Sequence, residues 1–416
     1  MAVISGRYGS VQRLLPTLID PVTGKYTWQT VNSAAASTST GFTAINEDPA
    51  QPNFTDDPAT SGMAVADQTT VSSVTSWSLE NTVQPITYIA SNTRGYQGKL
   101  EGLHSCTGQI AGIGGCPPIG PGQRFKFLGY VGPTNGKLDS KVGHVYAITA
   151  IANSVQVQIN YQMSNPITWT VGWQSDWKES GDELLHNSYK TSETGAPIGI
   201  AGFWDYTKPP CATMMPSTAC NLVIGGRPQT AVTTGDGQEA VTTYHDTYDL
   251  CLVDANIQFQ TEVANFANSC SASAGGWQTC TVGATNCTLN ANIHGDHYGI
   301  IRENHLPGSN HNVKLFVEGN KPTGVDCDWL AHWEFEKMFF GSFGGLNVDV
   351  TTNNPLQFSC AMEFNAFPGC APGFIRYRPP LLRTMTTPQG GGEPVETYSA
   401  QDKVYFIDLR PESEQD

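Results

Sequence analysis

The sequence predicts a mainly β chain with two tandem units and little helix. Three observations predict this fold class: stretches with an apolar residue at every second position, a composition rich in turn residues, and a second copy of the first pattern further along. Gly (43) and Pro (26) are abundant, and charged residues make up only 14% of the 416 residues. Runs of helix-forming residues are nearly absent, so strands joined by turns are expected.

The clearest alternation covers His144–Trp177, on both sides of a break at Ser164–Pro166. Because successive side chains of a strand point to opposite faces, this pattern predicts a hairpin with one apolar and one polar face. The predicted packing face holds Val157, Ile159, Trp169, Val171 and Trp173, and the polar face holds Gln156, Gln158, Asn160, Thr168, Thr170 and Gln174.

A second hairpin with the same alternation is predicted over residues 346–364, with its break at Thr352–Pro355. Its packing face holds Val348, Phe358, Met362 and Phe364, and its polar face holds Asn347, Asp349, Gln357, Ser359 and Glu363. The polar faces of both hairpins are expected to meet water.

The two hairpins belong to a longer internal repeat. Asn165-Pro166 matches Asn354-Pro355, a shift of 189 residues (165 to 354). Further matches follow in the same order: Ile110–Gly112 with Ile293–Gly295, Pro121-Gly122 with Pro307-Gly308, Phe125–Phe127 with Val313–Leu315, and His144 with His332. The shared order and the nearly constant shift favour a tandem duplication.

Taken in order, the chain divides into five segments. Residues 1–69 are expected to form an N-terminal arm with an extended loop, 70–178 the first β domain, 179–246 a linker, 247–369 the second β domain and 370–416 a C-terminal extension. Arg124–Val131 is a predicted strand, and Val404–Ile407 can add an edge strand. Glu179–His186 is the candidate for a short helix. Trp329–Phe343 fits a strand or a short helix, and the repeat favours a strand.

Charge and hydropathy exclude several classes of protein. The formal charge of −15 argues against a protein that grips nucleic-acid phosphates, which needs clustered Lys and Arg. No stretch approaches the ~20 apolar residues that cross a bilayer. The first residues lack a secretory signal, so the chain is expected to fold where it is made.

The 11 cysteines leave two alternatives open. Cys106/Cys116, Cys211/Cys220 and Cys270/Cys280/Cys287 are close enough in sequence for local bridges. Reduced, buried thiols are the default for a cytosolic product.

No catalytic residue, metal or cofactor is predicted, and the chain is expected not to be an enzyme. His294, His297, His305 and His311 with Cys280 and Cys287 fit no common zinc spacing, so solvated histidines are favoured. Neither a P-loop nor a Gly-x-Ser-x-Gly elbow occurs. Trp169, Trp173, Trp177, Trp329 and Trp333 could stack on carbohydrate, but a core or interface role is favoured.

The order of several motifs resembles the tail tube proteins of long-tailed, siphovirus-like bacteriophages, here with a tandem-duplicated tube domain. The resemblance covers about residues 70–177 and, more loosely, 247–367. It rests on Ser76–Glu80, Ser91–Gly95, Gly102, Thr107–Gly112, Pro121-Gly122, Ile159-Asn160, Asn165–Ile167 and Gly172-Trp173.

The resemblance implies β-sandwich or barrel domains, each flanked by a helix, whose long hairpins join into one barrel around a lumen. A two-domain chain would then form a ring of three, a pseudo-hexamer. Stacked rings would make a hollow conduit for genome passage during DNA ejection, lined by the polar faces of the hairpins.

It also implies partners and a location. The partners would be further copies of the chain, the tape measure, terminator and distal tail proteins, and double-stranded DNA only in passing, with no membrane. The location would be the virion tail, after assembly in the bacterial host cytoplasm. The alternative is another tail or baseplate component, such as a distal tail protein or a carbohydrate-binding adhesion protein.

Overall fold

The computed structural model describes residues 10–19, 26–31, 42–44, 74–131, 142–160, 166–178, 182–190, 221–225, 248–266, 276–294, 308–317, 331–347, 357–367, 372–379, 382–386, 395–399 and 403–411. Nearly all regular structure in these segments is strand, which confirms the predicted mainly β class. An 18-stranded antiparallel sheet dominates, with two separate two-stranded ribbons, β5-β6 and β20-β21. The helical element within the described segments is one 3-10 turn, η2 (Ser91–Thr93).

The strands of the first half are β1 (Ser10–Ile19), β2 (Tyr26–Val31), β3 (Phe42–Ala44), β4 (Val74–Val83), β5 (Ile86–Tyr88), β6 (Gly98–Leu100), β7 (His104–Ile113), β8 (Arg124–Val131), β9 (Val142–Asn160), β10 (Thr168–Ser175) and β11 (Leu185–Lys190). Those of the second half are β12 (Asn221–Gly225), β13 (Tyr248–Leu250), β14 (Leu252–Phe266), β15 (Thr279–His294), β16 (Asn310–Phe316), β17 (His332–Asn347), β18 (Gln357–Phe364), β19 (Phe374–Arg378), β20 (Leu382–Thr386), β21 (Val395–Ser399) and β22 (Val404–Asp408).

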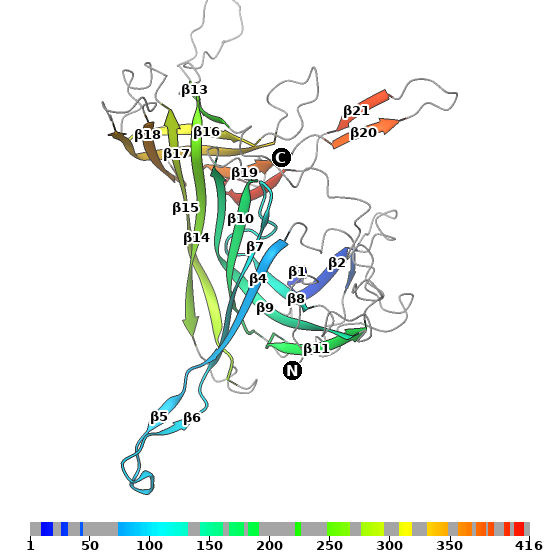
Figure 1. The fold of residues 1–416 in the computed structure, drawn as a ribbon, viewed down its shortest axis with the longest axis vertical. Helices are drawn as coiled ribbons and strands as arrows, with labels where there is room; N and C mark the ends of the chain where they lie inside the picture. Colours follow the sequence, from blue (N-terminus) through cyan, green and yellow to red (C-terminus); the bar gives the residue numbers. More distant parts are fainter. Residues whose placement is uncertain are drawn as a thin grey trace, which may run out of the picture.

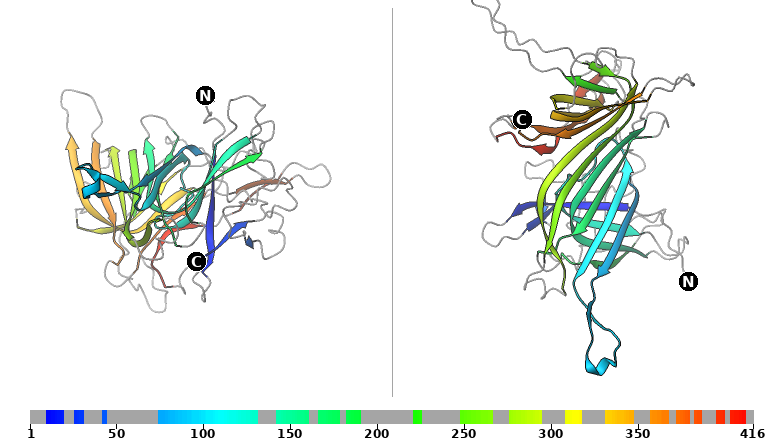
Figure 2. Two further views of the ribbon diagram at one scale, coloured as in Figure 1. Left: turned by 90° about the horizontal axis from the view of Figure 1, so that it is seen from below. Right: turned by 90° about the vertical axis from the view of Figure 1, so that its left-hand side faces the viewer.

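Eight of these strands form a continuous antiparallel wall in the order β4-β7-β10-β9-β14-β15-β18-β17. Four strands of the wall come from each half of the chain, and the pairing of β9 with β14 joins them. Figures 1 and 2 show the long strands lying side by side. We call the two halves of the wall, with the strands that cover them, the first and the second unit.

The long strands β9 and β17 each belong to two layers. The first part of β9 pairs with β8 and β11, whereas its last part pairs with β10 and β14. Likewise, β17 pairs first with β16 and β19 and then with β18. The first parts fold over the apolar face of the wall, so each unit is a two-layer sandwich with its core between the layers.

The same β-bulge marks the point where each long strand enters the wall. The register of β9 with β10 shifts between Gly172 and Trp173, which leaves Asn153 unpaired. The register of β17 with β18 shifts in the same way and leaves Gly341 unpaired. The bulge lies next to Trp173 in the first unit and next to Met362 in the second. These two residues are 189 positions apart (173 to 362), which is the shift of the sequence repeat. A bulge bends its strand, which fits this change of layer.

The register corrects one match of the sequence repeat. Gly112 lies opposite Trp169, and Ile293 lies opposite Phe358, the residue equivalent to Trp169. Ile293 therefore corresponds to Gly112 and not to Ile110, a slip of two residues. Because side chains alternate with a period of two, a two-residue slip leaves every residue on its face, and the alternation could not reveal it.

The predicted short helix is wrong where the structure describes it. Asp182–Leu184 are not helical, and Leu185 and His186 begin β11, which pairs with β9. The edge pairing gives this amphipathic stretch a place on the sheet that local helix propensity does not register. Residues 179–181 lie outside the described segments.

Three other expectations can be compared with the strands. Arg124–Val131 is strand β8, the ambiguous Trp329–Phe343 stretch is strand from His332 on, and Val404–Asp408 forms β22 beside β19. Two described parts of the expected linker, β11 and β12, pair with β9 and β16. The acidic end from Glu412 lies outside the described residues.

Candidate assembly interface

The apolar face of the wall is covered by the outer layers. Of the predicted packing residues, Val157, Ile159, Trp169, Val171, Trp173, Phe358 and Met362 are buried, and Phe364 is half-buried. Trp173 packs against Phe127, and Trp333 of the second unit packs against Phe259 and Phe406. Val348 lies outside the described residues.

The opposite face of the wall is polar. Gln158, Ser359 and Glu363 are exposed, and Gln156, Asn160, Thr168, Thr170, Gln174 and Gln357 are half-buried. Asp349 and the side chain of Asn347 lie outside the described residues. The acidic residues on this face include Glu80, Asp254 and Glu363. The eight wall strands contain no Lys or Arg, if β9 and β17 are counted only from their bulges onward.

Amide side chains form hydrogen bonds between strands on this face. Gln156 Nε2 donates to Asn256 Oδ1 at 3.0 Å, across the β9–β14 pairing. Asn292 Nδ2 donates to Asp254 Oδ1 at 2.8 Å, and Gln174 Nε2 donates to Asn265 Oδ1 at 2.6 Å. These bonds fix side chains that would otherwise bind water, so the polar face is an ordered surface.

The internal joint is the pairing of β9 with β14. Seven residues of each strand lie opposite one another, from Ser154↔Gln260 to Asn160↔Asp254. Val155, Val157 and Ile159 face Phe259, Ile257 and Ala255 on the buried side. The two units thus share one continuous core as well as one sheet.

A buried ion cluster forms a second connection between the two units. Arg124 Nε lies 3.0 Å from Asp176 Oδ2, and Arg124 Nη2 lies 2.6 Å from Asp182 Oδ2. Both carboxylates are almost fully buried. Asp176 Oδ1 also accepts from the backbone N–H of Cys280 at 3.1 Å, and Lys178 Nζ donates to the Cys280 carbonyl at 2.6 Å. Asp176 therefore links the end of β10 to the start of β15.

The two ends of the wall are open. β4 pairs with β7 on one side, and β17 from Ser342 to Asn347 pairs with β18 on one side. Within the described segments, no strand pairs with the other side of either one. Free strand edges carry unpaired N–H and C=O groups and are templates for pairing with another chain.

Sequence reasoning did not place β4 at an edge of the sheet or β14 at the joint. The signal was present in β14, where Ala255, Ile257 and Phe259 alternate with Asn256, Gln258 and Gln260. This is the same alternation that identified the two hairpins. Which strand lies beside which is a long-range property that alternation does not carry.

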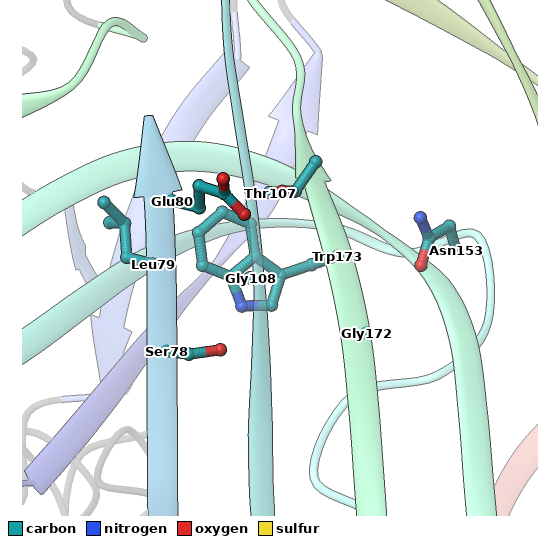
Figure 3. A pocket seen from close by; sticks show the side chains of 8 residues that line it. All are labelled: Ser78, Leu79, Glu80, Thr107, Gly108, Asn153, Gly172 and Trp173. Carbon is teal, nitrogen blue, oxygen red and sulfur yellow. The ribbon is translucent and has the colours of Figure 1, made fainter. Parts of the chain in front are cut away.

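One shallow depression of about 350 Å³ lies on the first unit (Figure 3). It is lined by Ser78, Leu79, Glu80, Thr107, Gly108, Asn153, Gly172 and Trp173. It forms where Gly108 and Gly172 have no side chain and the indole of Trp173 packs below Gly108. Its lining holds the carboxylate of Glu80 and the hydroxyls of Ser78 and Thr107, and it contains no histidine, lysine or cysteine that could activate a hydroxyl.

The other candidate residues fall in the core or outside the described segments. Trp169, Trp173, Trp177 and Trp333 are buried and offer no face to a carbohydrate. The expectation of a solvated histidine is wrong for His311, which is buried beside Ser309 and Phe340, and His294 is half-buried at the end of β15. His297, His305 and Trp329 lie outside the described residues. Among described residues, no group of three or more His, Cys, Asp or Glu is placed to hold a metal ion.

Six cysteines lie in the described segments, Cys106, Cys116, Cys251, Cys280, Cys287 and Cys360, and no disulfide joins any two of them. Burial raises the pKa of Cys106, Cys280 and Cys360 to about 12, and it raises the pKa of Cys287 as well. Thiols with a raised pKa are poor nucleophiles, so these four serve packing. No helix in the described part of the chain is long and apolar enough to cross a membrane.

No protein-family model and no curated protein sequence matches the chain. Among solved structures, the chain is similar to a protein of the sheath–tube complex of an extracellular contractile injection system, PVC, in the extended state. The identity is 8% and the TM-score 0.23, over 35% of this chain and 84% of the other. It is also similar to a chain of the tube-terminating cap of the anti-feeding prophage, with 12% identity and a TM-score of 0.21, over 35% and 83%.

Proposed function

We propose that this chain is a structural protein of a phage tail, and that three copies form a ring whose walls join into one closed barrel. The observation that carries the proposal is the internal joint. The chain already contains one seam, between β9, the equivalent of β17, and β14, the equivalent of β4. No strand of the described segments pairs with the outer edge of β4 or with that of β17 from its bulge onward. Because β9 corresponds to β17 and β14 corresponds to β4, the pairing of β14 with β9 can be repeated between β4 of one copy and β17 of the next.

The repeat gives the register of the proposed seam. Ser154 of β9 and Ser342 of β17 each follow the equivalent bulge, so these two residues correspond. The pairings of β10 with β7 and of β7 with β4, compared with those of β18 with β15 and of β15 with β14, show that Thr82 corresponds to Gln260. Because Ser154 lies opposite Gln260 in the internal joint, Ser342 of one copy is expected opposite Thr82 of the next. The strands would be antiparallel, as β9 and β14 are.

Closure would place the polar face inside. The outer layers cover the apolar face, so three copies fit around an axis only when those layers point outward. Three chains, each with eight wall strands, would give a barrel of 24 strands, and barrels of about 16–18 strands already enclose an aqueous channel.

The chemistry of this face suits a conduit. An amide-rich, mildly acidic surface without Lys or Arg offers no counter-charge to phosphates, so DNA would pass without being held. Stacked rings would then form the tail tube through which the genome leaves the virion. The tape measure, terminator and distal tail proteins would be the neighbours of such a tube.

Cysteine cross-linking tests the seam. Thr82→Cys with Ser342→Cys in one chain is expected to give disulfides between copies, with covalent trimer as the largest product on a non-reducing gel. Directly opposite strand residues lie within disulfide range. Ser154→Cys with Gln260→Cys is the matched control, expected to close within one chain. Glu80→Cys with Ser342→Cys is two residues out of register and is expected to cross-link far less.

Native mass spectrometry of the unmodified protein gives the copy number. A stable monomer at high concentration, or cross-links that ignore the register, would contradict the ring. The alternative, a distal tail or adhesion component, predicts single rings or monomers that never extend into tubes.

A further inference from the structure

A projecting arm extends from the first unit between β4 and β7. The arm comprises Gln84–Leu103 and contains the ribbon β5-β6 and the turn η2. It continues beyond the end of the wall, away from the outer layers (Figures 1 and 2). The corresponding connection of the second unit, between β14 and β15, has 12 residues and one large apolar residue, Trp277, which is buried. Within the segments that the structure describes, each chain thus carries one such arm.

Large apolar side chains gather on the arm without cover. Tyr96 is 80% exposed, Ile89 67% and Ile86 57%, and Leu100 and Tyr88 are also exposed. Isolated exposed apolar residues are ordinary, whereas several on one short projecting element indicate a contact surface.

The arm is shaped in advance of any contact. The ring of Tyr88 lies over Gly98, where any side chain would overlap it, and Gln84 N–H donates to the Leu103 carbonyl at 3.0 Å. At its base, His104 stacks on Trp277 of the second unit at 5.3 Å and lies 2.8 Å from Glu101. A two-stranded ribbon is at best marginally stable alone, so a fixed base and a partner surface both favour its order. Pre-shaping lowers the ordering cost of binding.

The charge of the arm opposes that of the whole chain. It carries Arg94 and Lys99 against Glu101, which already faces His104, while the chain has a net charge of −15. Another copy of this acidic chain is therefore an electrostatically favourable partner.

We propose that the arm docks on a second copy of this chain in the adjacent ring, so that rings stack through three arms. This inference rests on the proposed ring. The seam uses the two lateral edges of the wall, whereas the arm extends along the strands, so the two contacts do not compete. One arm per chain makes the stacking contact threefold, although the barrel is built from six similar units.

Substitution of the exposed apolar residues tests the arm. The triple variant Ile86→Ser, Ile89→Ser and Tyr96→Ser is expected to keep the trimeric ring in native mass spectrometry and to lose tubes, with mean tube length in negative stain falling at least tenfold. Phe367→Ser with Val395→Ser is the matched control, since these residues are 58% and 53% exposed and lie outside the arm. The control is expected to form tubes of normal length.

The outcomes separate the two proposals. A wild-type chain that forms no ring contradicts the proposed function, whereas rings that stack equally well without the apolar arm residues overturn the arm alone. A photo-reactive residue at position 96 gives a second measurement that does not depend on the folding of the triple variant. Cross-links to another copy are expected in tubes and not in separated rings. Cross-links confined to one ring, or made only to other proteins or lipid, would overturn the inference.

Discussion

The two units keep the same wall and bury different polar groups. Both units place a bulge at the equivalent point of the long strand, at Asn153 and at Gly341. The first unit buries Arg124 with Asp176 and Asp182. The second instead buries Glu334 beside Arg376, with Arg378 Nε at 3.1 Å and His332 Nε2 at 3.0 Å.

The difference separates what the wall requires from what each unit can vary. Register and bulge decide whether neighbouring strands meet, and an error of one residue would turn the polar face inward to the core. A buried charge needs only a nearby partner, and several positions can supply one. Conservation of geometry with divergence of charge is therefore expected for units that share one sheet.

Removing one partner of either ion cluster is expected to have the largest effect. Glu334→Ala removes the carboxylate that Arg376 and Arg378 share, which is expected to cost about 3–5 kcal/mol of unfolding free energy. Asp176→Ala removes one of the two carboxylates that hold buried Arg124 and is expected to cost less, because Asp182 stays in place. Urea unfolding measures the loss. Glu363→Ala, exposed on the wall, is the control and is expected to stay within about 0.5 kcal/mol. Equal, small losses in all three variants would show that the clusters do not stabilise the units.

Exchanging one core pair between units sharpens the comparison. Gly108 lies opposite Trp173, where the equivalent residues of the second unit are Leu289 and Met362. Gly108→Leu is expected to cost about 1–3 kcal/mol, because its side chain would overlap the indole of Trp173 and the Ser78 carbonyl.

Adding Trp173→Met, which copies the pair of the second unit, is expected to recover part of that loss in the same unfolding assay. Gly120→Ala is the control, since its nearest neighbour is Gln123 Oε1 at 3.8 Å. A double variant less stable than the sum of both single variants would contradict the size match.

Acid is expected to weaken the second unit through Glu334. Burial alone would raise the pKa of Glu334, but hydrogen bonds from His332 and Arg376 and the charges of Arg376 and Arg378 hold the pKa well below its usual range. The stabilisation is therefore complete above the unfolded pKa of about 4.3 and is lost as the pH falls further. Between about pH 5 and 3, wild type should lose on the order of 1–2 kcal/mol more than Glu334→Gln. If the unfolding free energies of wild type and Glu334→Gln fell in parallel as the pH is lowered, this stabilising role of Glu334 would be contradicted.

The smallest effect is expected for the amide bonds of the polar face. Gln156→Ala removes the bond to Asn256 at the internal joint and should cost about 0.5–1.5 kcal/mol. Gln174→Ala removes the more exposed bond to Asn265 and should cost less. Chemical denaturation measures the loss of unfolding free energy in both variants. A larger loss for Gln174→Ala than for Gln156→Ala would contradict a special role for the joint.

Alternation along the chain predicted the strand content and the two faces of the hairpins. Val157, Trp169 and Met362 are buried, while Gln158 and Glu363 are exposed, because a period of two translates directly into faces. It could not predict that β9 lies beside β14, which depends on contacts about 100 residues apart.

Two errors have the same origin. The helix expected at Glu179–His186 becomes strand at Leu185 because the edge of β9 is available there, and a local pattern cannot see that edge. The two-residue slip between Ile110 and Gly112 keeps every face unchanged, so only the pairing with β10 and β18 reveals it. The open edge of β4 was missed since nothing in its own residues distinguishes an edge from an interior strand.

The covalent connection across the β9–β14 seam has a consequence for how a closed ring would form. Six separate units would have to give up their translational and rotational freedom at every one of six contacts, whereas three double units do so at three. The other three contacts form at the effective concentration of two tethered partners, which is far above that of free protein in a cell. Gene fusion would thus favour complete rings over partial arcs without changing a single side chain at the contact itself.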